Sequence, residues 1–333
     1  MKVNLDKRQV LVTGAGGFIG SHLVEALLAL GASVRAFVHY NSRGSWGHLN
    51  HLAHASKTDQ LQVIAGDIRD PFFVHTAVAG CDTVFHLAAL IAIPFSYIAP
   101  QSYVGTNITG TLNVLEACRR AGVRRLVHTS TSETYGTARF TPIDEGHPLQ
   151  GQSPYSATKI AADKLAESFA CSYELPVVTL RPFNTFGPRQ SARAVIPTII
   201  SQIAAGKSEI ALGSLSPIRD FTFVKDTVDA FIAMARASLA PGELVNVGSG
   251  VGVTIGEVAA LIQELMGTTV PVREEEDRIR PAKSEVMQLL CANAKAAAQL
   301  DWHPRYSLAA GLQETIAYVT ANLPAYRTDI NNL

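Results

Sequence analysis

The chain has 333 residues, of which 47% are apolar and 17% are charged, and its 28 basic side chains balance its 28 acidic ones. This composition is typical of a globular protein and excludes long disordered segments, while the zero net charge argues against binding to nucleic acid or to an anionic membrane. The length favours two structural units over one.

The four cysteines are widely spaced and include no CxxC pair, so we predict neither a metal site nor a disulfide framework. No window offers the roughly 18 uninterrupted apolar residues of a membrane span. The N-terminal segment lacks the apolar stretch of a signal peptide. We therefore expect a soluble cytoplasmic protein that binds small molecules.

The first predicted elements are a strand, a tight turn and a helix. "QVLVTG" (9–14) is a short apolar run, and leucines recur at helical spacing in "SHLVEALLALG" (21–31). Glycines between them let the chain turn closely and bring a pyrophosphate to the free N–H groups of the helix. The predicted cofactor-binding residues of this turn are Gly14, Gly17, Phe18, Ile19 and Gly20.

Further apolar runs alternate with mostly helical patterns along the first half of the chain. Strands that are apolar on both faces and alternate with helices indicate a parallel sheet covered on both sides. We therefore predict an α/β fold in which residues 1–182 form a Rossmann-type, doubly wound parallel sheet that binds a dinucleotide. The predicted strands after the first lie at 33–38, 61–66, 82–89, 124–130 and 176–182.

The two clearest helices span 102–121, which Gly122 ends, and 153–173, where Ser153 is expected to be the N-cap. Beyond residue 182 the segments become shorter, with a last helix expected near 307–322. We predict that residues 183–333 mainly form a smaller C-terminal α/β lobe that binds the substrate. Segments near 220–247 are expected to return to the first unit.

The end of the second strand, "FVHYNSRGS" (37–45), lacks the Asp or Glu that commonly binds the ribose 2′-hydroxyl of NAD. Cationic and hydroxyl side chains there suit a 2′-phosphate, so we expect NAD(P), with NADP favoured. The candidates at this end are His39, Asn41, Ser42 and Arg43. Asp67 and Ile68 are candidates for holding the adenine, and Leu87, Ala88 and Ala89 for passing beneath the middle of the cofactor. Ordinary strand ends explain these last two stretches equally well.

Tyr155 and Lys159 stand four residues apart in a predicted helix, so both side chains point to one face. Tyr155 can accept a proton from a sugar hydroxyl only if its pKa falls from about 10 towards 7, which requires about 4 kcal/mol. One ammonium provides that much only where water is largely excluded. We therefore expect Lys159 to act in a closed site, together with the charge of an oxidised nicotinamide.

These motifs resemble those of the extended short-chain dehydrogenases/reductases over nearly the whole chain. More narrowly, the chain resembles the nucleotide-sugar 4,6-dehydratases, and most of all the UDP-N-acetylglucosamine 4,6-dehydratases of legionaminic-acid-type pathways. The resemblance implies a tightly bound NAD(P), a UDP-sugar substrate and a homodimer formed through helices 102–121 and 153–173. The blocks that carry it are "STSETYG", "YSATK", "RPFNTFGPRQSARAVIP", "GSLSPIRDFTFVKD" and "RPAKSEV".

By this resemblance Thr131 would hydrogen-bond the C4 oxygen and Tyr155 would be the C4 base, held with the nicotinamide ribose by Lys159. Oxidation of C4 makes the hydrogen at C5 acidic, so Glu133 can remove it while the C6 hydroxyl leaves and the hydride returns to C6. The implied substrate-binding residues are Asn184, Arg193, Arg219 and Arg280. Guanidinium groups suit a diphosphate on chemical grounds as well.

Ser132 departs from the family pattern, because many sugar 4,6-dehydratases carry Asp before the glutamate as the acid for the leaving hydroxyl. Serine is a poor acid at neutral pH. Either Glu133 delivers the C5 proton to the leaving oxygen, or a water held by Ser132 and Thr134 relays it.

Three other functions share parts of this pattern. The Thr-Ser-Glu order also resembles UDP-glucuronic acid decarboxylases, which lose carbon dioxide after the same C4 oxidation. A UDP-sugar 4-epimerase has no step that requires Glu133. A non-enzymatic, dinucleotide-sensing protein of the same fold would not need Thr131, Tyr155 and Lys159 together.

Overall fold

A seven-stranded, fully parallel sheet forms the centre of the molecule, with the strand order β10-β6-β5-β4-β1-β2-β3. The computed structural model describes residues 4–54, 60–328 and 330. All residues of β4 and β6 are buried, as expected for strands covered on both faces. The strands are β1 (Gln9–Thr13), β2 (Ser33–His39), β3 (Leu61–Gly66), β4 (Thr83–His86), β5 (Arg125–Thr129), β6 (Val177–Pro182) and β10 (Leu244–Val247).

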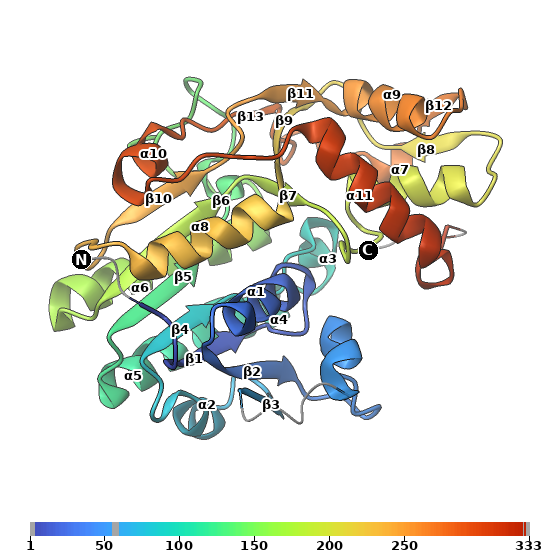
Figure 1. Ribbon diagram of the computed structural model, residues 1–333. Coiled ribbons are helices and arrows are strands. Elements are labelled where there is room, and N and C mark those ends of the chain that lie inside the picture. Colours follow the sequence, from blue (N-terminus) through green and yellow to red (C-terminus); the bar gives the residue numbers. More distant parts are fainter. Residues whose placement is uncertain (1–3, 55–59, 329, 331–333) are drawn as a thin grey trace.

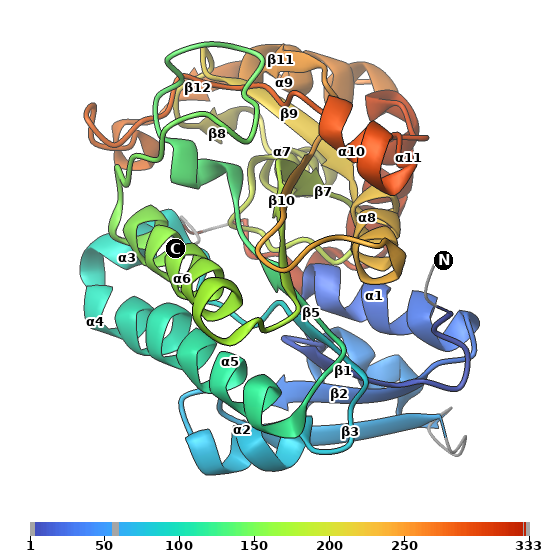
Figure 2. The same ribbon diagram turned by 90° about the vertical axis from the view of Figure 1, so that its left-hand side faces the viewer.

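Helices cover both faces of this sheet, which confirms the predicted Rossmann-type α/β fold (Figures 1 and 2). Helices α1 (Phe18–Ala29) and α8 (Val224–Arg236) pack together on one face. Helices α2 (Pro71–Val78), α5 (Gly110–Ala121) and α6 (Pro154–Tyr173) cover the other. Ser153 caps α6 in a reciprocal box with Ser156, and Gly122 ends α5 in the left-handed conformation, with φ +64°.

The single helix predicted over residues 102–121 is wrong in detail, because a π-helical turn divides it. The chain forms α4 (Pro100–Tyr103), the π-helix η2 (Val104–Thr109) and then α5. The wide turn directs the buried Asn107 amide inward, where it accepts from Leu90 N and donates to Leu90 O and to Thr158 Oγ1 on α6. The π-turn thus ties this helix to the helix that carries Tyr155 and Lys159.

The second half of the chain builds two small sheets, one in the order β11-β9-β13 with β7 beside β9, and one that pairs β12 with β8. Its strands are β7 (Asn184–Phe186), β8 (Ile210–Leu212), β9 (Ile218–Phe223), β11 (Gly252–Thr254), β12 (Val272–Glu274) and β13 (Gln288–Leu289). Its helices are α7 (Val195–Ala204), α9 (Ile255–Leu265), α10 (Ala294–Leu300) and α11 (Leu308–Ala321). The remaining short helices are α3 (Ile93–Ile98), η1 (Gly47–His54), η3 (Ser132–Tyr135), η4 (Glu276–Arg278) and η5 (Leu323–Ala325).

Two elements of the second half lie against the large sheet. Helix α8 packs on α1 and on strands β5 and β6, and β10 pairs with β6 to become the sheet's edge. Strand β9, from the same stretch of sequence, stays in the small sheet. In the part of the chain that the structure describes, no helix is long and apolar enough to span a membrane.

Candidate active site

The glycine turn between β1 and α1 is built for close approach. Gly14 has φ +69°, and a Cβ there would lie 2.8 Å from Ala88 N, at the end of β4. A Cβ on Gly20 would lie 2.2 Å from Gly14 O. Gly17 is the N-cap of the 12-residue α1 and provides no side-chain cap, so the first N–H groups of this helix are left for a ligand. This arrangement fits a pyrophosphate.

His39, the last residue of β2, and Ser42 and Arg43 in the loop that follows are exposed. Asn41 in the same loop forms hydrogen bonds to the loop's own backbone. The Asn41 amide donates to His39 O and Ser45 O, and its oxygen accepts from Arg43 N and Ser45 N. Asn41 thus shapes the loop through its side chain, and its contact with the cofactor stays a prediction.

At the end of β3 the Asp67 carboxylate forms an ion pair with Arg69, which lowers the pKa of Asp67. The neighbouring Ile68 is buried. Sequence reasoning did not single out Arg69, which adds an exposed cation beside the residue expected to hold the adenine.

A directional chain of hydrogen bonds connects the strand ends beneath the expected cofactor to the π-turn. Thr13 Oγ1 accepts from Leu87 N and Ala88 N, both at 3.1 Å, so its own proton goes to His86 Nδ1, 2.8 Å away. His86 Nε2 then donates to Thr111 Oγ1 at 3.0 Å, and Thr111 donates to the carbonyl oxygen of Asn107. Burial holds the pKa of His86 well below its ordinary value, which is consistent with this neutral tautomer.

The structure brings the predicted catalytic residues together from two elements. Thr131 is the N-cap of η3 and accepts from Glu133 N at 3.3 Å, while the Glu133 side chain is only 12% exposed. Tyr155 and Lys159 are buried on α6, and a hydrogen bond from the Thr131 side chain acts on Tyr155. Lys159 Nζ donates to Thr129 O at 2.6 Å, which fixes the ammonium under the end of β5.

In the chain alone the pKa of Tyr155 lies above the ordinary value of a tyrosine, whereas the predicted fall towards 7 includes the charge of a bound nicotinamide. Burial is the main cause, the Thr131 hydrogen bond opposes it, and the charge of Glu133 adds to it. Burial also lowers the pKa of Lys159 to about 8, against the attraction of Asp163. Desolvation of the phenolate is therefore the largest effect on the pKa of Tyr155, and a positive charge placed beside it would lower that pKa.

A buried polar network that sequence reasoning missed lies directly behind these residues. The Asp163 carboxylate accepts from Ser130 Oγ at 2.5 Å and from Arg181 Nη2 at 2.7 Å, and lies 3.1 Å from His128 Nε2. The Arg181 guanidinium also stacks on the ring of Tyr135, 4.5 Å from its centroid. The one signal in the sequence was that Asp163 follows Lys159 by four residues, which places both side chains on the same helix face, one turn apart.

Two of the predicted substrate-binding arginines meet near Glu133. Arg219 lies in strand β9, and its Nη2 donates to Glu285 Oε1 at 3.1 Å. Arg280 Nη1 lies 3.8 Å from both Glu133 Oε1 and Glu285 Oε1, and this buried nitrogen has no hydrogen-bond partner. Glu285 was not predicted.

Asn184 and Arg193, the other two predicted substrate ligands, differ in their surroundings. The Asn184 Oδ1 atom is buried without a hydrogen-bond partner, which leaves capacity for a ligand. Arg193 is exposed in the turn just before α7, and its Nε donates to Ser191 Oγ at 3.1 Å. Its charge also acts on Tyr103, which packs edge-on against Tyr155.

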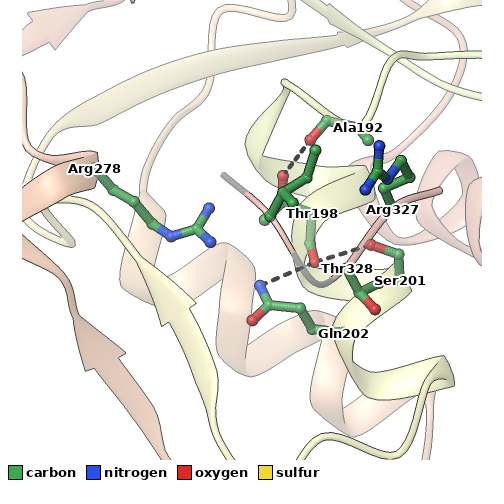
Figure 3. A pocket seen from close by; sticks show the side chains of 8 residues that line it. Ala192, Thr198, Ser201, Gln202, Arg278, Arg327 and Thr328 are labelled. Carbon is green, nitrogen blue, oxygen red and sulfur yellow. Dashed lines mark hydrogen bonds between the residues drawn. The ribbon is translucent and has the colours of Figure 1, made fainter. Parts of the chain in front are cut away.

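Two cavities lie outside this group of residues. One of about 10 Å³ lies between α7 and the C-terminal segment, lined by Thr198, Gln202, Arg278 and their neighbours (Figure 3). It contains none of the predicted site residues. The other, of about 480 Å³, lies behind α6 and is lined in part by Asp163 and Arg181. Among the described residues no cluster of metal-ligating side chains occurs.

Comparison with known proteins places the chain among nucleotide-sugar enzymes. Residues 11–315 match the family model described as GDP-mannose 4,6 dehydratase. A dTDP-glucose 4,6-dehydratase from Actinoplanes sp. is 31% identical over 94% of this chain and 98% of its own length.

Two solved structures have the same fold over nearly their whole length. The UDP-N-acetylglucosamine 4-epimerase of Methanobrevibacter ruminantium, in complex with UDP-N-acetylmuramic acid, has a TM-score of 0.86 at 30% identity, covering 95% of this chain and 99% of that one. The dTDP-glucose 4,6-dehydratase of Streptomyces venezuelae, with NAD bound, has a TM-score of 0.85 at 28% identity, covering 96% and 98%.

Proposed function

Because the chain belongs to the GDP-mannose 4,6-dehydratase family, whose matched relatives are nucleotide-sugar dehydratases and 4-epimerases, we propose that it is a nucleotide-sugar 4,6-dehydratase. Its proposed substrate is UDP-N-acetylglucosamine, in line with the sequence motifs. The observation that carries the proposal is the Glu133 carboxylate, which is largely buried, follows Thr131 on η3 and acts electrostatically on Tyr155. An epimerase has no step for such a carboxylate.

The residues present fit a dinucleotide. The glycine turn would hold the pyrophosphate, and the ends of β3 and β4 would hold the adenine and pass beneath the middle of the cofactor. When bound, the nicotinamide supplies the redox chemistry that no side chain can perform, taking up a hydride from C4 and returning it to C6. A positive charge on the bound nicotinamide would also lower the pKa of Tyr155, which burial raises.

In the proposed reaction Tyr155 takes the proton of the C4 hydroxyl while Thr131 hydrogen-bonds the C4 oxygen. Lys159, protonated below about pH 8, stabilises the tyrosinate. Glu133 then removes the C5 proton, which the neighbouring ketone has made acidic, and the C6 hydroxyl leaves with a proton as water. Once the hydride has returned to C6, C5 takes up a proton from solvent by way of Glu133, and the proton on Tyr155 passes to solvent, so the net change is the loss of one water.

The proton for the leaving hydroxyl is proposed to come from Glu133 itself. Thr134 Oγ1 already donates to Thr131 O at 2.7 Å, so it can accept from a water but cannot donate to one. In the alternative, a relaying water held by Ser132 and Thr134 would donate one hydrogen to Thr134 Oγ1 and the other to the leaving oxygen.

For the cofactor we propose NADP as the preferred form, with NAD as the alternative. The exposed His39 and Arg43 and the missing carboxylate at the end of β2 support it, although the dehydratase from Streptomyces venezuelae was solved with NAD. Titration of the apoprotein with both nucleotides tests this: a lower Kd for NAD would overturn the preference.

The activity is tested by incubating the purified protein with UDP-N-acetylglucosamine and, separately, with UDP-glucuronic acid, and following the sugar by mass spectrometry. Loss of a mass of 18 from the first confirms the dehydratase. Loss of 44 from the second would instead identify the runner-up, a UDP-glucuronic acid decarboxylase. An isomerised sugar with no change in mass would identify a 4-epimerase, and no change in any substrate would overturn all three.

We also propose a homodimer that packs the helices of 102–121 and 153–173 against their copies. Val104 and Leu112 are apolar residues of this face that are each 39% exposed. Light scattering at micromolar concentration is expected to give twice the chain's 35.6 kDa. A monomer at that concentration would contradict the proposal.

A further inference from the structure

Asp163 is a buried carboxylate on α6 that is hydrogen-bonded to strands β5 and β6 and to the residue that follows β5. It lies one helical turn after Lys159 on α6, and its side chain is only 5% exposed. Ser130 and His128 reach it from β5 and the residue that follows, and Arg181 reaches it from β6. A buried charge persists only when it is paired and hydrogen-bonded in this way.

These contacts tie both ends of the loop with Thr131 and Glu133 to α6. At its start, Ser130 donates to Asp163 and accepts from Arg181 Nε at 3.1 Å. At its end, the Tyr135 ring packs under the Arg181 guanidinium, and the Tyr135 hydroxyl donates to Asn246 Oδ1 at 2.8 Å. The pair Asp163–Arg181 is thus the shared anchor of two elements that have to meet at the substrate.

Asp163 also lies on the same face of α6 as Lys159, four residues further along the helix, and carries a negative charge. The charged or titratable groups that interact electrostatically with Lys159 are Asp163 on α6, Arg181 on β6, His128 on β5 and His86 on β4. Burial lowers the pKa of both histidines, so they are neutral near pH 7. Asp163 therefore opposes the desolvation of the ammonium, while Arg181 acts in the opposite direction.

We propose that Asp163, paired with Arg181, is a positioning residue that holds the loop of Thr131 and Glu133 against the helix of Tyr155 and Lys159 and keeps the Lys159 ammonium charged. The proposal rests on the C4-oxidation half of the proposed function, which dehydratase, decarboxylase and epimerase share. It does not depend on which group leaves the sugar.

The expected effect has a defined sign. Lys159 acts in its protonated form, so activity is lost as the pH rises through its pKa, which is about 8. Asp163→Asn removes the anion but leaves Arg181, so this alkaline loss is expected to move to lower pH by about one unit. We expect kcat at pH 7 to fall by about tenfold or more, and the Kd for UDP to change less than twofold, because the diphosphate arginines lie elsewhere.

A second variant separates this role from a failure to fold. Asp163→Asn leaves a buried guanidinium unpaired, whereas the double variant Asp163→Asn/Arg181→Met removes both charges. Because the two charges act on Lys159 in opposite directions, the alkaline loss in the double variant is expected to lie between those of wild type and Asp163→Asn. Glu167→Gln, an exposed change one turn further along α6, is the matched control and should leave the profile unchanged.

The ionisation of Lys159 can also be followed without turnover, by competitive acetylation with acetic anhydride across pH and peptide mass spectrometry. In Asp163→Asn, acetylation of Lys159 is expected to begin at lower pH than in wild type. The shift should equal that of the alkaline loss of activity. A folded Asp163→Asn protein with the wild-type alkaline loss and the wild-type acetylation profile would overturn the inference. If instead wild type transforms none of the UDP-sugars tested yet binds UDP, the proposed function fails and acetylation alone decides the role of Asp163.

Discussion

The two sides of the candidate site differ in how their charged groups are paired. On the side of the large sheet, Lys159, Asp163 and Arg181 have hydrogen-bond partners within the chain, whereas the uncharged atoms His128 Nδ1 and Thr129 Oγ1 beside them are buried without one. On the side of the small lobe, Arg280 Nη1 and Asn184 Oδ1 are buried without any. Unpaired buried groups are costly, so a ligand that pairs them is favoured. The side that would perform the chemistry is preorganised, and the side that would bind the nucleotide is left for its ligand to complete.

The strongest test of this contrast is Tyr155→Phe on the paired side. Loss of the C4 base is expected to lower the rate of sugar conversion by about 10³-fold, within the usual range for a general base. Among the described residues no hydrogen bond or ring contact joins Tyr155 to the arginines proposed for the diphosphate, so the Kd for UDP from calorimetry should change less than twofold. A variant with unchanged turnover would support the non-enzymatic, dinucleotide-sensing alternative.

Glu133→Gln separates the two halves of the reaction. Water loss is expected to fall by about 10²-fold or more because an amide cannot remove the C5 proton. Exchange of the C5 hydrogen with solvent deuterium, followed by mass spectrometry, should fall equally. Glu276→Gln, an exposed change on the small lobe, is the control. If C5 exchange persists in Glu133→Gln, another group is the C5 base.

Arg280→Gln probes the unpaired side. A lost charge-assisted hydrogen bond to a diphosphate is worth about 2 kcal/mol, so the Kd for UDP should rise by about 30-fold. Arg273→Gln, which changes an exposed arginine paired with Glu209 and Glu275, serves as the control and should leave the Kd unchanged. Similar Kd values for the two variants would remove Arg280 from the diphosphate site.

The smallest effect is expected for Ser132→Asp, which restores the acid found in many sugar 4,6-dehydratases. If a proton donor is what limits water loss, the rate should be preserved or rise by about threefold at most. Ser132 is buried, so the purified variant should first be checked for an unchanged melting temperature. A clear loss of rate in a folded variant would show that Glu133 already performs both proton transfers.

Most of the fold could be predicted from local patterns. The apolar runs became β1 to β6, and Ser153 and Gly122 became the helix ends that their chemistry favours. The π-turn could not be predicted, because it depends on Asn107 finding partners on Leu90 and α6.

The candidate site was predictable where one element carried the information, as in the spacing of Tyr155 and Lys159. It was not predictable where the function of a residue depends on several elements. Asp163 acquires its meaning only when β5 and β6 bring His128 and Arg181 to it. Asn41 was predicted as a cofactor ligand, and the turn that it also stabilises could be recognised only from the backbone.

The edge strand β10 has a consequence for how this protein can be divided and recombined. Because β10 pairs with β6, a chain cut after Pro182 would leave the buried strand β6 as an open edge able to pair with other chains. Such a fragment is expected to aggregate, so the dinucleotide half cannot be exchanged as one continuous piece. A chimaera would have to carry α8 and β10 along with residues 1–182, and the substrate loops between and after them could then be replaced separately.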